Sequence, residues 1–134
     1  MSTFLLEIVT PERKVYAEPA NMIIAKGVEG ELGILPNHIP LVTPLKISSI
    51  TVKKQGSKDE IIAVNGGFME VRKDKVVILA ESAELPEQID VDRAKAAKER
   101  AEKRLADKQA NVDFKRAEAA LQRALNRITV SGGK

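Results

Sequence analysis

Short apolar segments separated by proline, glycine and polar turns fill the first two thirds of this 134-residue chain. Asn65-Gly66 is typical of a hairpin turn, and the polar residues of 55–59 and 72–75 indicate two further turns. Several short strands at near-regular spacing predict an antiparallel β-sandwich, or flattened barrel. The strands are expected over residues 4–9, 14–17, 21–26, 45–53, 61–64, 68–71 and 76–80.

The composition changes abruptly near Leu85-Pro86. All six prolines lie at or before Pro86, whereas ten alanines fall between Ala94 and Ala124. Proline removes a backbone donor and alanine favours helix, so β structure should give way to α structure at this point. The predicted fold class is therefore α+β, with a β-sandwich domain over residues 1–85 and a helical domain over residues 86–134.

The helical part is expected to form an antiparallel two-helix hairpin. Asp90 is a suitable N-cap for the first helix, residues 107–111 form a polar break, and Asn111 or Asp113 could cap the second helix. Because the seam is mostly alanine and leucine, it buries little apolar area, and we expect the hairpin to open easily. The apolar stripes at helical spacing are Val91, Ala94, Ala97, Ala101 and Leu105, then Phe114, Ala117, Leu121, Ala124 or Leu125, and Ile128.

The net charge of +3 is unevenly distributed. Residues 1–85 carry 10 Lys/Arg and 11 Asp/Glu, a balance of −1, whereas residues 86–134 carry 12 and 8, a balance of +4. The basic helical part therefore favours an acidic partner, which could be a protein, a nucleotide or a nucleic acid.

Several classes of protein are disfavoured by composition and motif. The chain has no Cys and one His, which argues against disulfides and a structural zinc site. Its longest uncharged run, residues 33–45, contains three prolines and is too short to span a membrane, and the N-terminus does not resemble a signal peptide. No nucleophile elbow or phosphate-binding loop is present, so the chain is expected not to be an enzyme. His38 lies in a proline-bounded loop, where it either contacts a partner or carries a proton, or is simply satisfied by backbone groups.

Three segments together resemble the epsilon subunit of rotary proton-translocating ATP synthases: GELGILPNHIPL (30–41), VNGGFMEV (64–71) and VILAESAE (77–84). The similarity continues through FKRAE (114–118) and LNR (125–127), although Asn37 stands where the family commonly has glycine. The resemblance implies a non-catalytic central-stalk subunit at the cytoplasmic face of the bacterial cell membrane. Its sandwich would bind the gamma subunit and the c-ring, through a subunit-contact loop comprising Glu31, Leu32, Gly33, Ile34, Leu35, Pro36 and His38.

The same resemblance implies a mobile hairpin that responds to ATP. Extended into the alpha and beta subunits, the hairpin would restrain ATP hydrolysis, and ATP would bind the folded form. Bacillus-like members of the family bind ATP through a pattern that IDVDRA (89–94) matches in full. The implied ATP-binding residues are Glu84, Ile89, Asp90, Arg93, Ala94, Arg123 and Arg127, with Arg116 as a weaker candidate and Mg²⁺ possible near Asp90.

Simpler interpretations of these residues remain open. Asp90 could act only as a helix cap, and any alanine-rich helix can place arginines four and seven residues apart, as Arg116, Arg123 and Arg127 are. The basic helices could instead bind nucleic acid, although interleaved acidic residues and the lack of a reading motif argue against it. A free-standing nucleotide sensor is the other alternative.

Overall fold

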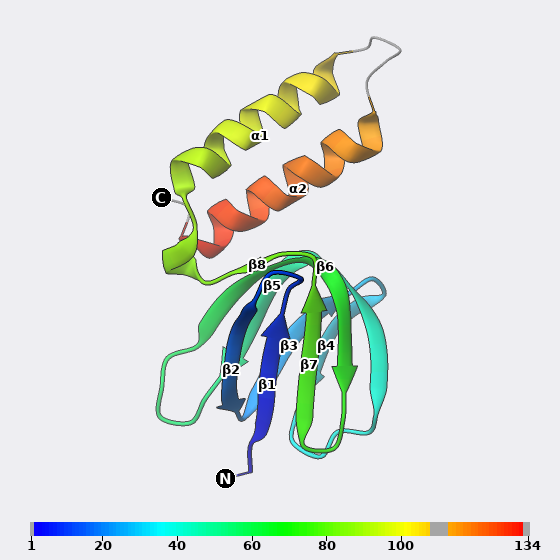
Figure 1. Cartoon of the computed structure of the whole chain (residues 1–134), viewed down its shortest axis with the longest axis vertical. Helices are drawn as coiled ribbons and strands as arrows, with labels where there is room; N and C mark the ends of the chain where they lie inside the picture. The colour runs from blue at the N-terminus through cyan, green and yellow to red at the C-terminus, as the bar shows by residue number, and fades with distance from the viewer. Residues whose placement is uncertain (1, 108–112, 133–134) are drawn as a thin grey trace.

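The structure is a computed structural model that describes residues 2–107 and 113–132. A body of strands is followed by two helices that lie beside it (Figure 1). The predicted fold class, a β-sandwich followed by a helical hairpin, is confirmed. The elements are β1 (Phe4–Val9), β2 (Lys14–Ala20), β3 (Met22–Gly27), β4 (Gly30–Ile34), β5 (Leu41–Lys53), β6 (Glu60–Val71), β7 (Lys75–Ala80), β8 (Ala83–Glu84), the 3₁₀ turn η1 (Pro86–Gln88), α1 (Val91–Ala106) and α2 (Phe114–Val130).

The strands form one continuous sheet in the order β2-β1-β7-β6-β5-β3-β4, with β8 paired to β6. One pairing corrects the expectation of an antiparallel sandwich, because β1 and β7 run parallel. Five strands intervene between these two, so no tight turn forces them to be antiparallel. The sheet is therefore mixed.

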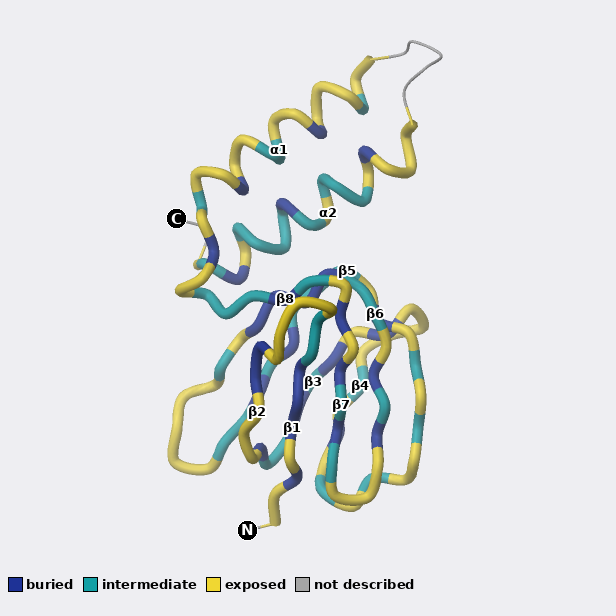
Figure 2. The backbone as a smooth tube through the Cα atoms, in the orientation of Figure 1, coloured by how far each residue is buried: buried dark blue, intermediate teal, exposed yellow. Residues whose placement is uncertain are grey.

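The core lies inside the folded sheet, where the apolar positions of its strands meet. Alternation places one set of side chains inward, and Figure 2 shows buried and exposed positions succeeding one another along the strands. The largest fully buried side chains come from β1, β3, β4, β5, β6 and β7: Leu6, Ile8, Ile23, Ile34, Ile50, Val52, Ile62, Val64, Met69, Val71, Val76 and Ile78.

The predicted hairpin at Asn65-Gly66 is wrong, because β6 continues through these residues without reversing direction. Gly66 and Gly67 have φ angles of 82° and 131°, so the left-handed freedom of these residues bends one long strand instead of reversing the chain. Both sides of the bend stay paired with β5, in an unchanged register from Leu41↔Val71 to Val52↔Glu60. A side chain at Gly67 would place its Cβ 2.1 Å from the Leu79 carbonyl oxygen, so the bend also needs the absence of a side chain.

The helices begin where the N-cap rule predicts. Asp90 accepts a hydrogen bond from the Arg93 N–H at 3.0 Å, and Asp113 accepts one from the Arg116 N–H at 3.1 Å. The alternative cap Asn111 and most of the predicted polar break lie outside the described residues. Phe114, expected in the apolar stripe, is instead 47% exposed because it opens α2 at the end far from the sheet (Figure 1).

The hairpin rests on the sheet through α2, which packs against β5 and β6, while α1 packs against α2. The buried residues of the seam are small: Ala94, Ala101, Ala117 and Ala124. A second small apolar cluster of Ala63, Ile89 and Val130 joins β6, the connection and the end of α2. No helix among the described residues is both long and apolar enough to cross a membrane.

Gly67→Ala should destabilise the sheet by at least about 2 kcal/mol, because the new methyl group meets a backbone carbonyl that cannot move aside. Gly30→Ala is the matched control, since Gly30 has a similar φ of 140° but nothing within 4 Å of the added atom. Urea unfolding measures both. Equal losses of unfolding free energy would contradict the close approach at Gly67.

The buried carboxylate Glu7 pairs with lysines of two neighbouring strands and gives the fold an acid-sensitive element. It is only 7% exposed and pairs with Lys14 of β2, at 2.6 Å, and with Lys75 of β7. Hydrogen bonds from Lys14, and to a lesser extent from Lys75, lower the pKa of Glu7 to about 2. Desolvation of the buried carboxylate acts in the opposite direction and raises the pKa, but its effect is smaller.

The folded-state pKa of Glu7 lies below its unfolded value, so its contribution to stability is present above about pH 4.5 and is lost as pH falls toward 2. The difference in unfolding free energy between the wild type and Glu7→Gln should therefore be constant near neutrality and shrink in acid. Urea unfolding at a series of pH values measures it, with Glu12→Gln in the exposed turn as control. A difference that does not change between pH 6 and 2.5, roughly the span of this titration, would contradict the assignment.

Candidate functional site

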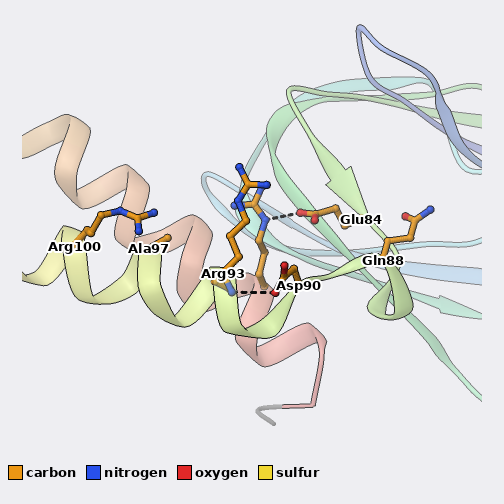
Figure 3. Close-up of a pocket in the computed structure, with 8 residues that line it drawn as sticks. Glu84, Gln88, Asp90, Arg93, Ala97 and Arg100 are labelled. Carbon is orange, nitrogen blue, oxygen red and sulfur yellow. Dashed lines mark hydrogen bonds and ion pairs between the residues drawn. The ribbon is translucent and has the colours of Figure 1, made fainter.

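A cavity of about 390 Å³ lies where the sheet passes into the helices. Its size is within the ~300–1,000 Å³ typical of small-molecule sites. The connection from β8 through η1 supplies one wall and α1 supplies a second (Figure 3). Arg127 of α2 also lines the cavity. The lining residues are Glu84, Gln88, Asp90, Arg93, Ala94, Ala97, Arg100 and Arg127.

The connection between sheet and helices is held in a defined shape. β8 pairs with β6 at Ala63↔Glu84, which fixes the position of the Glu84 carboxylate. Pro86 begins η1, and Gln88 Oε1 accepts hydrogen bonds from the Leu85 N–H at 3.0 Å and from Arg13 Nη2 at 3.3 Å. Next, Ile89 is buried against β6, so the polypeptide reaches Asp90 with its direction already set.

The charges of the cavity favour an anionic ligand. Glu84 Oε1 pairs with Arg127 Nε at 2.5 Å, and the Asp90 carboxylate is engaged at the N-terminus of α1. Across the described ranges, Arg93 and Arg100 have no ion-pair partner, so two guanidinium groups at the cavity retain their donors. Guanidinium groups offer paired donors that suit phosphate oxygens.

Five of the residues predicted for ATP binding meet at this cavity: Glu84, Asp90, Arg93, Ala94 and Arg127. Ile89 does not line the cavity and packs instead with Ala63 and Val130. Arg123 is one turn before Arg127, and Arg116 is about 16 Å from Arg127 along the helix. Neither residue lines the cavity, so their assignment stays a prediction.

Sequence reasoning missed Gln88, Ala97 and Arg100 as lining residues. Arg100 could have been found, because positions 93, 97 and 100 share one face of a helix. Gln88 gave no such signal, since its position depends on the 3₁₀ turn.

A magnesium ion near Asp90 is also a prediction that the geometry leaves open. The described residues hold no group of three or more His, Cys, Asp or Glu side chains that could bind a metal. A magnesium ion beside Asp90 would therefore take its other ligands from phosphate and water, as Mg²⁺ commonly does.

The predicted subunit-contact loop is in part a strand. Residues Gly30–Ile34 form β4, which pairs with β3 at the end of the sheet. Strand alternation therefore turns Ile34 into the core, at 1% exposure, and leaves Leu32 half-buried, whereas Glu31, Gly33 and Leu35 are exposed. Only the last part, with Pro36 and His38, is a loop.

His38 is satisfied by backbone groups, as one of the two interpretations expects. Its Nδ1 lies 2.7 Å from the Ile39 carbonyl oxygen, and because a carbonyl only accepts, Nδ1 carries the proton. The preceding Asn37 has a φ of 66°, which explains why this position suits asparagine as well as glycine.

Comparison with known proteins matches the whole described chain to one family. The family model for the β-sandwich domain of the ATP synthase delta/epsilon chain matches residues 3–86, and the model for its long α-helix domain matches residues 87–132. ATP synthase epsilon chains are among the relatives. That of Halalkalibacterium halodurans is 59% identical over 98% of this chain and 99% of its own, and that of Bacillus cytotoxicus is 57% identical over 100% of both.

Solved structures give the same result for the fold. A chain in a cryo-EM structure of the Euglena gracilis mitochondrial ATP synthase, comprising OSCP, F1 and c-ring, superposes with a TM-score of 0.80 at 25% identity, covering 94% of this chain and 79% of that one. A chain in the central stalk and c-ring of the Tetrahymena thermophila mitochondrial ATP synthase superposes with a TM-score of 0.58 at 14% identity, covering 96% of both.

Asp90→Ala should lower the stability of α1 by about 1 kcal/mol, because the Arg93 N–H loses its capping acceptor. Asp90→Ser should retain most of that stability, since a serine hydroxyl can also cap a helix. Thermal unfolding followed by circular dichroism at 222 nm, the usual helix signal, measures both, with Asp113→Ala and Asp113→Ser as the matched pair at the other N-cap. An Asp90→Ala variant as stable as the wild type would show that the cap contributes nothing.

Proposed function

The chain belongs to the delta/epsilon chain family of ATP synthases, and on this basis we propose that its non-catalytic role is to join the gamma subunit to the c-ring and to regulate ATP hydrolysis. The sheet is the rigid part of the protein in this proposal, and the hairpin is the regulatory part. A position at the cytoplasmic face of a bacterial cell membrane, bound through the complex, follows from the same role.

The contact with rotor partners is supported by exposed apolar side chains in the segment that follows β4. Leu35 and Ile39 are 56% and 75% exposed at one end of the sheet, beside the exposed Glu31. Exposed apolar side chains gathered in one loop are typical of a protein-binding surface. This end of the sheet is the part that we assign to the c-ring.

The proposal that ATP binds the folded hairpin depends on one observation above all. Residues of β8, η1, α1 and α2 that are up to 43 positions apart meet around a single cavity with two uncommitted guanidinium groups. Arg127 lines this cavity and pairs with Glu84 of β8, so the cavity in this form includes α2 lying on the sheet. ATP bound there would therefore favour the folded hairpin over the extended one.

The free energy available from ATP is sufficient for such a switch. A ligand that binds one state only, at 100 times its dissociation constant, favours that state by about 2.7 kcal/mol. The seam between the helices is largely alanine, so the opposing preference need not be large. When ATP is scarce, the hairpin would extend and restrain hydrolysis, with its basic residues near acidic groups of a beta subunit.

Isothermal titration of ATP against Asp90→Ser and Asp113→Ser tests the nucleotide site. Both substitutions retain a helix cap, but only Asp90 lines the cavity. Asp90→Ser should therefore weaken ATP binding by about tenfold, the effect of losing one charged hydrogen bond, while Asp113→Ser should leave the affinity unchanged.

Equal affinities in the two variants, or no ATP binding by the wild type at millimolar ATP, would overturn the nucleotide site. The proposed role as a stalk subunit would survive either result, because it does not depend on the cavity.

ATP hydrolysis by the reconstituted complex tests the regulatory role. Complex containing the full-length chain should hydrolyse ATP more slowly at low ATP than complex containing a chain truncated after Glu87. The difference should shrink as ATP rises, because ATP holds the hairpin in its folded form. Equal rates at every ATP concentration would remove the inhibitory role from the hairpin.

A further inference from the structure

Asn126 attaches α2 to the sheet by hydrogen bonding, beside the Arg127–Glu84 pair. The Asn126 side chain donates from Nδ2 to the Ser48 carbonyl oxygen of β5 at 2.8 Å, and the same nitrogen lies 3.4 Å from Asn65 Oδ1 of β6. Asn65 is itself 1% exposed, and its Nδ2 donates to Ser82 Oγ at 2.8 Å. Three segments of the sheet domain therefore meet beneath one side chain of the hairpin.

The chemistry of these groups fixes which atoms face one another. A backbone carbonyl only accepts, so the amide nitrogen of Asn126 must point toward Ser48. Asn65 commits its own nitrogen to Ser82, so its oxygen is the atom turned toward Asn126. Two acceptors therefore converge on one donor, and no acceptor could replace Asn126 Nδ2 without repulsion.

The Ser48 carbonyl lies where the sheet is irregular. Pairing between β3 and β5 shifts register between Ile24 and Gly27, opposite the stretch of β5 from Leu45 to Thr51. Ser48 lies within that stretch, so its carbonyl oxygen is accessible to a helix side chain.

The residue that follows Asn126 is Arg127, which lines the cavity and pairs with Glu84. Glu84 is in β8, which pairs with β6 at Ala63↔Glu84 and Val64↔Ala83, directly before Asn65. Both residues of the Arg127–Glu84 pair are therefore held near the same part of β6. Glu84 is held there by the pairing of β8 with β6, and Arg127 by the neighbouring Asn126.

We propose that Asn126 is a positioning residue for the nucleotide cavity: its hydrogen bond to Ser48 places Arg127 beside Glu84, and so sets ATP affinity without contact with the ligand. The ATP part of this inference rests on the proposed function. The placing of Arg127 does not, since both contacts are present in the protein alone.

Asn126→Asp is the sharpest test, because it keeps the size of the side chain and replaces the donor with a charged acceptor facing two oxygen atoms. Gln122→Glu is the matched control: it makes the same amide-to-carboxylate change at an exposed position of α2 that does not line the cavity. Asn126→Ala removes the donor without adding charge and serves as the second variant.

Two readouts on the full chain separate placement from binding. The first is the nuclear magnetic resonance signal of the Arg127 Nε–H group, which reports its pairing with Glu84 in the absence of nucleotide. The second is ATP affinity by isothermal titration. Asn126→Asp should shift or broaden the Nε–H signal and weaken ATP binding by about tenfold or more, and Asn126→Ala should do so less strongly. Gln122→Glu should leave both readouts at wild-type values.

An unchanged Arg127 signal in Asn126→Asp and Asn126→Ala would overturn the inference, as would equal effects of Asn126→Asp and Gln122→Glu. If the Asp variant does not fold, judged by its circular dichroism, the Ala variant decides by the same criteria. A wild-type chain that does not bind ATP would overturn the proposed nucleotide site and the affinity part of this inference. The Arg127 signal would then still decide whether Asn126 positions the pair.

Discussion

The contact between α2 and the sheet is the feature on which the remaining structure of the hairpin depends. α1 packs mainly on α2 (Figure 1), and Val91 at its N-terminal end packs against the cluster that contains Ala63 of β6, so the position of both helices depends largely on what α2 touches. That contact combines a few apolar side chains, Ala63, Ile89 and Val130, with hydrogen bonds and ion pairs of Asn126 and Arg127. Polar contacts exchange with water at little net cost, so an interface of this kind can separate without unfolding either part.

The sheet, unlike the hairpin, is stabilised mainly by the burial of large apolar side chains. Its core is formed by large, fully buried aliphatic side chains, and its long strands β5 and β6 cross the whole body. Burying such side chains contributes about 1.5–3 kcal/mol each, far more than the alanine seam of the hairpin can supply. The proposal of a rigid sheet and a detachable pair of helices rests on this difference in buried side-chain size between the two parts of the sequence.

Much of this arrangement could be predicted from the sequence, where the information is local. Alternation located most strands, and Asp90 and Asp113 marked the starts of both helices. The failures concern residues whose role depends on distant partners. Asn65-Gly66 has the composition of a turn, but β5 and β7 on either side make it a bend in one strand. Family resemblance placed Glu84 and Arg127 in one site, yet nothing marked Asn126, because its main partner is the backbone carbonyl of Ser48.

The most direct test of the account is the distance between α2 and the sheet with and without ATP. The chain contains no cysteine, so spin labels at Gln122→Cys and Lys58→Cys, both exposed positions, would be the only two labels. Double electron–electron resonance should give a single short distance at saturating ATP and a broader distribution with longer distances in its absence. A distribution that is identical with and without ATP, in a chain that titration shows to bind it, would contradict the claim that nucleotide holds the hairpin against the sheet.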